Sequence, residues 1–321
     1  MGSKLPLNFI LSFSREMIPE NGEDSYCHCF CDTAGMVAVF DGCGGAGARK
    51  HAHYSDKSEA YMASRFCSGV FFDQFCQTFP SEMTAEEFVK DCLTPAVKER
   101  LHEYQPPKEG FEIRGSMVRT LPTTVAAALI QQEKDGTQTV SAIWAGDSRV
   151  YILDEKGLAQ LTVDDTSVPD PMENLYEDGV LKNILCADRA LTLHCRSVRM
   201  DKPFLVFAAT DGCFGYVTTP MEFEGLLLQN LMAAESLAQW EERLYQTIGQ
   251  VAGDDYSLCM AAYGDLDLKR LQTALAGRFA MLRDTCLTKL AGLPVEDRQT
   301  RIELWQGYKD NYLRFMKDGN T

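Results

Sequence analysis

The sequence predicts an α+β protein in which buried strands form the centre and amphipathic helices flank them. Short apolar runs rich in Val, Ile, Phe and Ala indicate buried strands over 37–40, 139–145, 204–209 and 258–263. Apolar residues at steps of three and four indicate helices over 55–79, 84–104 and 222–251. The strands therefore belong to the core and the helices to its covering.

Composition and charge narrow the class of protein. With 321 residues, 45% hydrophobic and 24% charged, the chain matches ordinary soluble globular proteins. The net charge of −15 disfavours nucleic acid as a partner. The apolar runs 124–130 and 204–209 fall well short of the roughly 20 residues of a membrane helix. The first residues lack a cleavage site, and Pro6 stands where a myristoylation motif needs a hydroxyl residue. We expect a cytoplasmic protein that contacts no membrane.

The cysteines are expected to be free thiols. The chain has 12 of them, no Cys-x-x-Cys pair, and a length that needs no disulfide framework. Cys27, Cys29 and Cys31 alternate with His28 and Phe30, which predicts a strand with three small side chains on one face. A zinc site is the weaker alternative, because neighbouring positions on one strand face rarely complete a tetrahedron.

The pattern changes after Tyr263, where apolar residues recur at steps of three and four over 268–286 and again over 302–315. Gly292 and Pro294 interrupt the two stretches, so we expect a helical hairpin. This divides the chain into a main domain, 1–264, and a helical extension, 265–321. The extension either covers the main domain or serves as a partner or dimer surface.

Aspartates stand at the ends of the predicted strands. Asp41 and Asp211 follow two apolar runs, Asp147 follows a third, and Asp254 precedes the fourth. A single Asp-Gly pair is most often just a turn. If the strands are neighbours, however, these carboxylates converge on one rim and repel one another unless a cation neutralises them. Oxygen ligands favour Mg²⁺ or Mn²⁺.

Six segments resemble, in order, the motifs of the protein phosphatase 2C family of metal-dependent serine/threonine phosphatases. VAVFDGCGG resembles VFDGHGG, AIWAGDSRVYIL resembles VGDSR, and FLVFAATDGCFGYV resembles a strand ending in SDGLWD. DDYSLCMAAYG, TTVAAALI and LTVDDTS are similar to the DN-x-T/S, GSTA and LTxDHS stretches. The resemblance covers roughly 23–264 and is closer to the stand-alone bacterial members. It implies a central sandwich of two mostly antiparallel sheets flanked by helices, with a metal site in a cleft at one edge.

The resemblance also implies the metal ligands. Asp41 would bridge two Mn²⁺ or Mg²⁺ ions, Gly42 would offer its backbone carbonyl to one, and Asp211 and Asp254 would ligate the other. Asp41 and Asp211 would thus be the residues on which catalysis depends.

Three further carboxylates match the family pattern. Glu23 and Asp24 correspond to the acidic pair that holds metal-bound waters, and Asp147 corresponds to a ligand of a third, weaker ion. The implied reaction is hydrolysis of phosphoserine or phosphothreonine by water that the metal pair activates. The implied partners are phosphoproteins and an opposing Ser/Thr kinase.

The chain departs from the family pattern at several positions. Cys43 replaces a His, and Pro19 replaces the phosphate-binding Arg, so Arg15, Arg49 or Lys50 would have to bind phosphate. In addition, Asp165 stands in place of the His of LTxDHS, and Gly215 stands in place of the final Asp of SDGLWD. These changes keep open an alternative function as a catalytically impaired binding or regulatory module.

Two other interpretations stay open at this point. Cys43 and Arg49 have the Cys-x5-Arg spacing of cysteine phosphatases, although the acidic surroundings disfavour a thiolate. The acidic segment 164–178 is interpreted as a solvated loop, or as a surface that attracts basic peptides.

Overall fold

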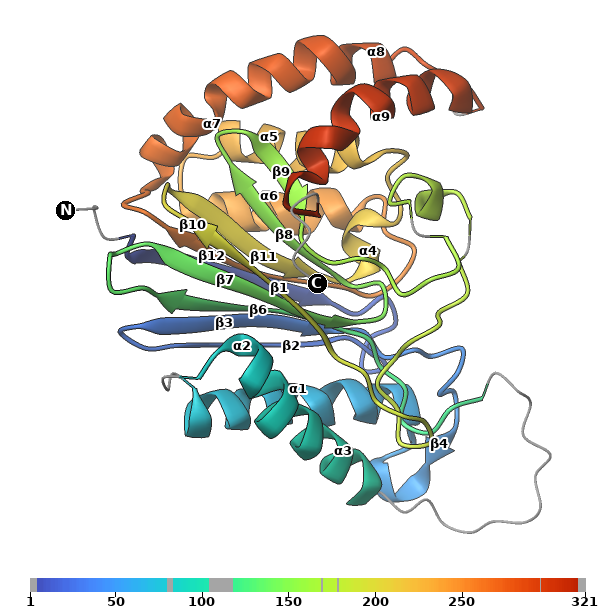
Figure 1. The fold of residues 1–321 in the computed structure, drawn as a ribbon. Coiled ribbons are helices and arrows are strands. Elements are labelled where there is room, and N and C mark those ends of the chain that lie inside the picture. Colours follow the sequence, from blue (N-terminus) through green and yellow to red (C-terminus); the bar gives the residue numbers. More distant parts are fainter. Residues whose placement is uncertain are drawn as a thin grey trace.

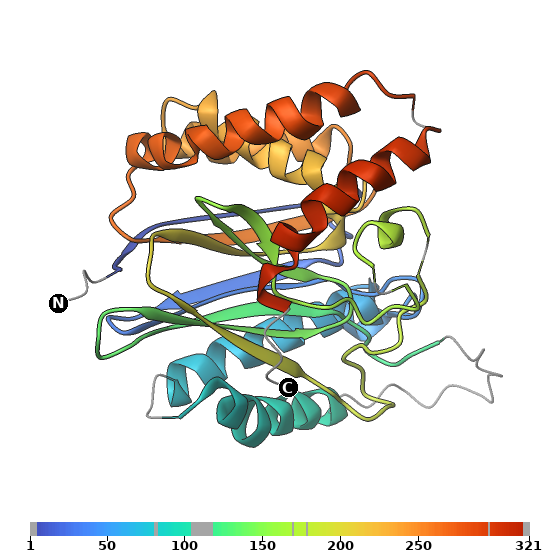
Figure 2. The ribbon, with the colours of Figure 1, turned by 45° about the horizontal axis from the view of Figure 1, so that its top comes forward.

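The computed structural model describes residues 5–79, 83–103, 118–168, 170–177, 179–294 and 296–316. Across these residues the strands form two five-stranded sheets and one two-stranded sheet. The large sheets pack face to face, and each carries helices on its outer face (Figures 1 and 2). The predicted α+β sandwich of antiparallel sheets is confirmed.

The first large sheet has the strand order β1-β12-β11-β8-β9, and all its neighbours are antiparallel. Its strands are β1 (Leu7–Arg15), β12 (Tyr256–Tyr263), β11 (Phe204–Ala209), β8 (Arg149–Asp154) and β9 (Gly157–Gln160). The three central strands are almost wholly buried, which explains why they read as continuous apolar runs in the sequence.

The second large sheet has the order β10-β7-β6-β3-β2 and is also antiparallel throughout. Its strands are β10 (His194–Met200), β7 (Gln138–Ala145), β6 (Val125–Gln132), β3 (Ala34–Phe40) and β2 (Ser25–Phe30). Val37 and Val39 of β3 pack between the two sheets, whereas Met36 and Phe40 pack against the helices. This alternation fills the sandwich from both faces of the strand.

The helices outside the second sheet come from one stretch of chain. They are α1 (Glu59–Thr78), α2 (Ala85–Glu87), the π-helical η2 (Phe88–Leu93) and α3 (Thr94–Glu103). The expected helix over 55–79 begins only at Glu59. The residues before it form β4 (Lys50–His51), the short helix η1 (Ala52–Tyr54) and β5 (Lys57–Ser58), and Ser58 caps α1 by accepting a hydrogen bond from the Tyr61 amide.

The helix expected over 222–251 is two helices, which cover the first sheet. They are α5 (Pro220–Met232) and α6 (Leu237–Gly249). Thr219 caps α5 ahead of Pro220, and Ser236 caps α6 by accepting from the Gln239 amide at 3.1 Å. The apolar spacing continues across the connection, so periodicity alone did not reveal the break.

The C-terminal residues form the expected hairpin. Its helices are α7 (Leu268–Leu282), which continues through the π-helical η4 (Arg283–Leu287) into α8 (Thr288–Leu290), then α9 (Arg298–Tyr312) and η5 (Arg314–Met316). Trp305, Tyr308 and Tyr312 are buried in the same core as β11, β12 and α5. The hairpin thus covers the first sheet and its helices, as Figure 2 shows. Its use by a partner or a second copy stays a prediction.

The strand of alternating cysteines is confirmed, with one correction. Cys27 and Cys29 lie in β2 and pack toward the helices, while His28 faces Cys259 on the other side of the sheet. Cys31 lies beyond the end of β2 and is exposed, so the prediction that it shares this face was wrong. All twelve cysteines are free. No helix within the described residues is both long and apolar enough to span a membrane.

Candidate active site

The predicted strand-end aspartates meet at one end of the sandwich. Asp41 directly follows β3 of the second sheet, whereas Asp211 follows β11 and Asp254 precedes β12 in the first sheet. Asp147 lies in the turn between β7 and β8, which joins the two sheets. All four side chains line one cavity of about 520 Å³. The structure therefore brings together residues that are up to 213 positions apart, from Asp41 to Asp254.

The four carboxylates destabilise one another's charge. Burial raises the pKa of Asp41 well above its usual range, and the neighbouring Asp211 raises it further. Burial and Asp254 raise the pKa of Asp211, although a hydrogen bond from Asp41 lowers it in part. Burial, with Asp211 next in size, raises the pKa of Asp147 to about 8. Such a cluster keeps its negative charge at neutral pH only when a cation compensates it.

The loop after β3 requires glycine at position 42, where a Cβ would meet backbone atoms. A Cβ on Gly42 would come within 2.5 Å of the Ala60 carbonyl, and one on Gly44 within 2.0 Å of a Glu23 carboxylate oxygen. The Asp41 carbonyl accepts hydrogen bonds from the Thr124 amide and the Thr123 hydroxyl, both at 2.8 Å. The Asp-Gly pair is therefore packed against its surroundings and is more than a surface turn.

The acidic pair before β2 lies next to this cavity, where Glu23 faces the cavity-lining Gly44. Asp24 is buried and accepts a hydrogen bond from the Thr210 hydroxyl at 2.8 Å. Burial raises the pKa of Asp24 well above its usual range, and the hydrogen bond from Thr210 offsets only part of this increase. Glu23 accepts a hydrogen bond from Ser58 and faces Gly44. Burial raises the pKa of Glu23 as well.

This donor set suits a hard divalent cation, because it consists of carboxylate and backbone oxygens. Asp41, Asp147 and Asp211 are only partly buried, so an ion entering the cavity can reach them. Within the described part of the chain, however, no three Asp, Glu, His or Cys side chains are arranged as a ready-made metal-binding group. The chemistry of the donors fits, and the assignment of individual ligands stays a prediction.

Comparison with known proteins gives a match in structure but none in sequence. No family model matches the chain, and no curated protein matches its sequence. A bacterial serine phosphatase is 18% identical, with a TM-score of 0.57 over 79% of this chain and 96% of that chain. Serine/threonine phosphatase Stp1 from Staphylococcus aureus is also 18% identical, with a TM-score of 0.57 over 82% of this chain and 97% of that chain.

A third similar structure was determined with metal. The catalytic domain of the serine threonine protein phosphatase PstP, in complex with 2 manganese ions, is 18% identical to this chain. The match has a TM-score of 0.54 and covers 82% of this chain and 100% of that domain. The chain has the protein phosphatase 2C fold. The resemblance inferred from short motifs is thus confirmed at the level of the fold.

Asp255, to which the DDYSLCMAAYG motif assigned no role, and Arg65 hold the acidic pair of this phosphatase 2C fold in place. The Asp255 carboxylate accepts hydrogen bonds from the Met17 and Glu23 amides, both at 2.7 Å. Arg65 of α1 donates to the Gly22 carbonyl at 2.9 Å and stacks 3.5 Å above the Tyr61 ring. Asp255 could have been found from its place beside Asp254, whereas a lone arginine within a helix gave no signal.

The arginines expected to bind phosphate do not line the carboxylate cavity. Arg15 donates to the Tyr256 hydroxyl at 3.4 Å and lies over the Tyr245 ring of α6. Arg49 contributes its carbonyl to the Glu59 amide, and it is absent from the residues that line the cavity. The cationic side chains that do line it are Arg119, Lys182 and Arg189. They lie in connecting segments without a recognisable motif, so sequence reasoning missed them.

Cys43 lines the cavity as a neutral thiol. Burial raises the pKa of this thiol well above normal, and Asp41 adds to the effect. A cysteine phosphatase needs a thiolate held by positive charge. With Arg49 outside the cavity lining and carboxylates beside Cys43, the Cys-x5-Arg spacing does not produce such a site.

Three aspartates of the acidic segment 164–178 contact basic side chains of the domain. Asp164 forms a buried ion pair with Arg149 at 2.6 Å, and Asp165 lies 3.0 Å from His194. Asp170 pairs with Lys309 of α9 at 2.5 Å. These three carboxylates anchor the segment to the domain, whereas Glu173 and Glu177 are exposed. Attraction of basic peptides by the segment stays a prediction.

Proposed function

We propose that this protein is a metal-dependent protein serine/threonine phosphatase that hydrolyses phosphoserine and phosphothreonine with two Mn²⁺ or Mg²⁺ ions. The observation that carries the proposal is the convergence of Asp41, Asp147, Asp211 and Asp254 on one cavity of a phosphatase 2C fold. The two manganese ions in the similar PstP catalytic domain support the choice of cofactor. The substrates would be cytoplasmic phosphoproteins that an opposing Ser/Thr kinase supplies.

We assign three roles to the carboxylates of the site. Asp41, the Gly42 carbonyl, Asp211 and Asp254 would hold the ion pair, and Asp147 would hold a third, weaker ion. Glu23 and Asp24 would orient water around the pair. When bound, such ions supply an acidified water molecule as nucleophile and positive charge next to the phosphoryl oxygens.

The rest of the cavity would position the phosphorylated side chain. Arg119, Lys182 and Arg189 line the same cavity as the aspartates and would offset the phosphate charge that the metals leave uncompensated. Cys43 stands where many family members have His, and its neutral thiol is a poor proton donor to the leaving alcohol. We therefore expect water to protonate the leaving group and turnover to be slow.

A second candidate function is a phosphatase-like binding module. It is favoured by Cys43 and Pro19 at the two departing positions and by the lack of a ready-made ligand group within the described residues. Such a module would retain the fold and bind phosphoproteins without hydrolysing them.

Turnover and metal binding decide between the two. Release of phosphate from p-nitrophenyl phosphate and from a phosphothreonine peptide should require Mn²⁺, stop with EDTA, and fall at least about 100-fold in Asp211→Asn. Asp201→Asn, an exposed aspartate in the β10–β11 turn, is the matched control and should keep wild-type rates. A folded wild-type protein that binds Mn²⁺ by calorimetry but releases no phosphate would reject the enzyme and support the binding module.

A further inference from the structure

A second cavity adjoins the carboxylate cavity and has a different character. It measures about 400 Å³ and lies between the β1–β2 connection, the β4–β5 hairpin with the start of α1, and the segment before β12. Asp254 lines both cavities. Glu23 lines the second cavity and also faces Gly44, which lines the first. The two cavities therefore adjoin at Asp254 and Glu23.

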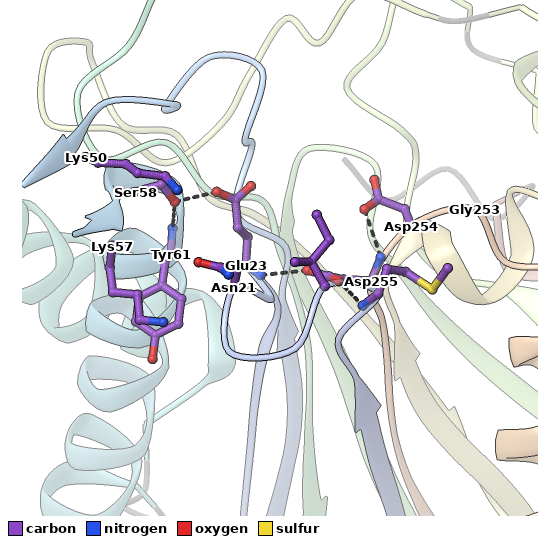
Figure 3. A pocket seen from close by; sticks show the side chains of 11 residues that line it. Asn21, Glu23, Lys50, Lys57, Ser58, Tyr61, Gly253, Asp254 and Asp255 are labelled. Carbon is purple, nitrogen blue, oxygen red and sulfur yellow. Dashed lines mark hydrogen bonds between the residues drawn. The ribbon is translucent and has the colours of Figure 1, made fainter. Parts of the chain in front are cut away.

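The hairpin side of this second cavity carries two lysines. Lys50 comes from β4 and Lys57 from the neighbouring β5, and both side chains line the cavity. Lys57 donates to the Glu20 carbonyl and lies 5.0 Å from the Tyr61 ring, so its ammonium group is held near the β1–β2 connection. Figure 3 shows both lysines on the side of α1, with Glu23 between them and Asp254.

The carboxylates that face these lysines are already engaged or belong to the proposed metal site. Asp255 accepts from the Met17 and Glu23 amides, and Glu23 accepts from Ser58. Metal ions at Glu23 and Asp254 would neutralise those two charges. With Glu23 and Asp254 assigned to the proposed metal site, Asp255 is the carboxylate of the lining that still faces the two lysines, which leaves a surplus of one positive charge in the second cavity.

The wall opposite the hairpin is apolar and exposed. Met17 is 40% exposed and Ile18 is 66% exposed, and both line the cavity. Exposed apolar side chains beside charged groups are typical of surfaces that contact a peptide. They can pack against the backbone and methylene groups of a substrate whose charged end reaches the lysines.

From these observations we propose that the second cavity is a subsite for an acidic side chain close to the phosphorylated residue of a protein substrate. The proposal rests on the proposed phosphatase function. An extended peptide advances roughly 3.3 Å per residue, so side chains one to three positions from the phosphorylated residue can reach the adjoining cavity. Lys50 and Lys57 thereby select substrates by the sequence around the phosphorylated residue.

The test uses phosphothreonine peptides that carry Glu, Gln or Lys at each of the three positions on either side of the phosphothreonine. The Mn²⁺-loaded full-length protein should prefer Glu over Gln at one or more positions, by about fivefold to tenfold in kcat/KM. Lys50→Gln/Lys57→Gln should abolish this ratio, and Lys50→Glu/Lys57→Glu should make the Lys peptide the better substrate. Lys269→Glu, an exposed lysine on α7, controls for net charge.

Binding provides a readout that does not depend on turnover. Fluorescence anisotropy with labelled peptides that carry a non-hydrolysable phosphonate should show the same Glu-over-Gln preference in the wild type and its loss in the lysine variants. If the double variants unfold, the single variant Lys50→Glu replaces them in the same measurement, because Lys50 is exposed on the short strand β4.

The outcomes separate the subsite from the enzyme. Turnover with no difference between Glu and Gln peptides would overturn the subsite while the phosphatase stands. A parallel loss on all peptides and on p-nitrophenyl phosphate would also overturn it, because the lysines would then act on the phosphate itself. Charge-dependent binding without turnover would reject the phosphatase and still support the subsite.

Discussion

At the scale of single residues, the candidate site holds carboxylates in an environment that opposes their charge. The Thr210 hydroxyl donates to the Asp24 carboxylate, and the Thr123 hydroxyl and the Thr124 amide fix the Asp41 backbone carbonyl. Burial and neighbouring carboxylates raise the pKa of both side chains. Carboxylates whose pKa values are raised by burial and by like charges occur mainly at functional sites. The arrangement is understandable if the compensating charge comes from a ligand.

The residue that best tests this positioning is Arg65, which lines neither cavity itself but contacts Tyr61 and the Glu23 carbonyl. Its guanidinium holds the Gly22 carbonyl and stacks on Tyr61, so it fixes the chain leading into Glu23. We expect Arg65→Ala to raise the Mn²⁺ concentration needed for half-maximal activity by about tenfold, because Glu23 loses its fixed orientation.

The measurement is a Mn²⁺ titration of activity together with calorimetric Mn²⁺ binding, which a purely structural role would not move. Arg65→Lys should restore part of the affinity, and Arg199→Ala, in an exposed pair with Asp135, is the control. An unchanged Mn²⁺ dependence in Arg65→Ala would show that Glu23 needs no such support.

At the scale of elements, the sequence predicts buried strands better than helix ends. The run over 204–209 coincides with β11, because continuous burial leaves a continuous apolar signature. The helix expected over 222–251 is interrupted, because the capping turn at Ser236 keeps the apolar spacing in phase. The pairing order of the strands is set by long-range contacts, and only the family resemblance anticipated the sandwich.

The C-terminal hairpin is tied to the domain by a buried ion pair. Arg278 of α7 donates to both carboxylate oxygens of Glu224 in α5, at 2.6 and 2.7 Å, and Tyr308 of α9 donates to the same carboxylate. Arg278→Ala leaves Glu224 buried without a counter-charge. We therefore expect a loss of about 3 kcal/mol and a Tm lower by roughly 4–5 °C.

Thermal unfolding followed by circular dichroism measures this loss. Arg283→Ala is the matched control, because its pair with Asp284 is exposed and contributes less than about 1 kcal/mol. If Arg278→Ala melted at the wild-type temperature, the hairpin would unfold independently of the domain, and the boundary expected after 264 would mark a separate unit.

At the scale of the whole molecule, the candidate site joins the two sheets at one end of the sandwich. Asp41 comes from the second sheet, and Asp211 and Asp254 come from the first. The spacing along the chain indicated each aspartate but not the basic side chains around them. Arg119, Lys182 and Arg189 reach the cavity through irregular connections, and no local pattern encodes such a long-range arrangement.

Because the site bridges both sheets, its protonation should control the stability of the whole metal-free protein. The pKa of Asp147 rises to about 8 on folding, mainly through burial and Asp211, from about 4 in the unfolded chain. Between these values the folded state binds more protons than the unfolded state. The contribution of Asp147 is therefore fully present below about pH 4 and is lost as the pH rises toward 8.

In EDTA, Asp147→Asn should consequently unfold at a higher Tm than the wild type at pH 8, and this advantage should shrink as the pH falls to 5.5. A gain of about 1 kcal/mol corresponds to roughly 1–2 °C in a chain of this length. Mn²⁺ should act in the opposite direction, since it binds the deprotonated carboxylates and should stabilise the wild type more at pH 8 than at pH 5.5. Differential scanning calorimetry of both proteins, with Asp201→Asn as control, measures each shift. Equal Tm values for Asp147→Asn and wild type in EDTA at pH 8 would mean that the charge of Asp147 does not destabilise the folded protein. The carboxylate cavity would then not need a bound cation for stability.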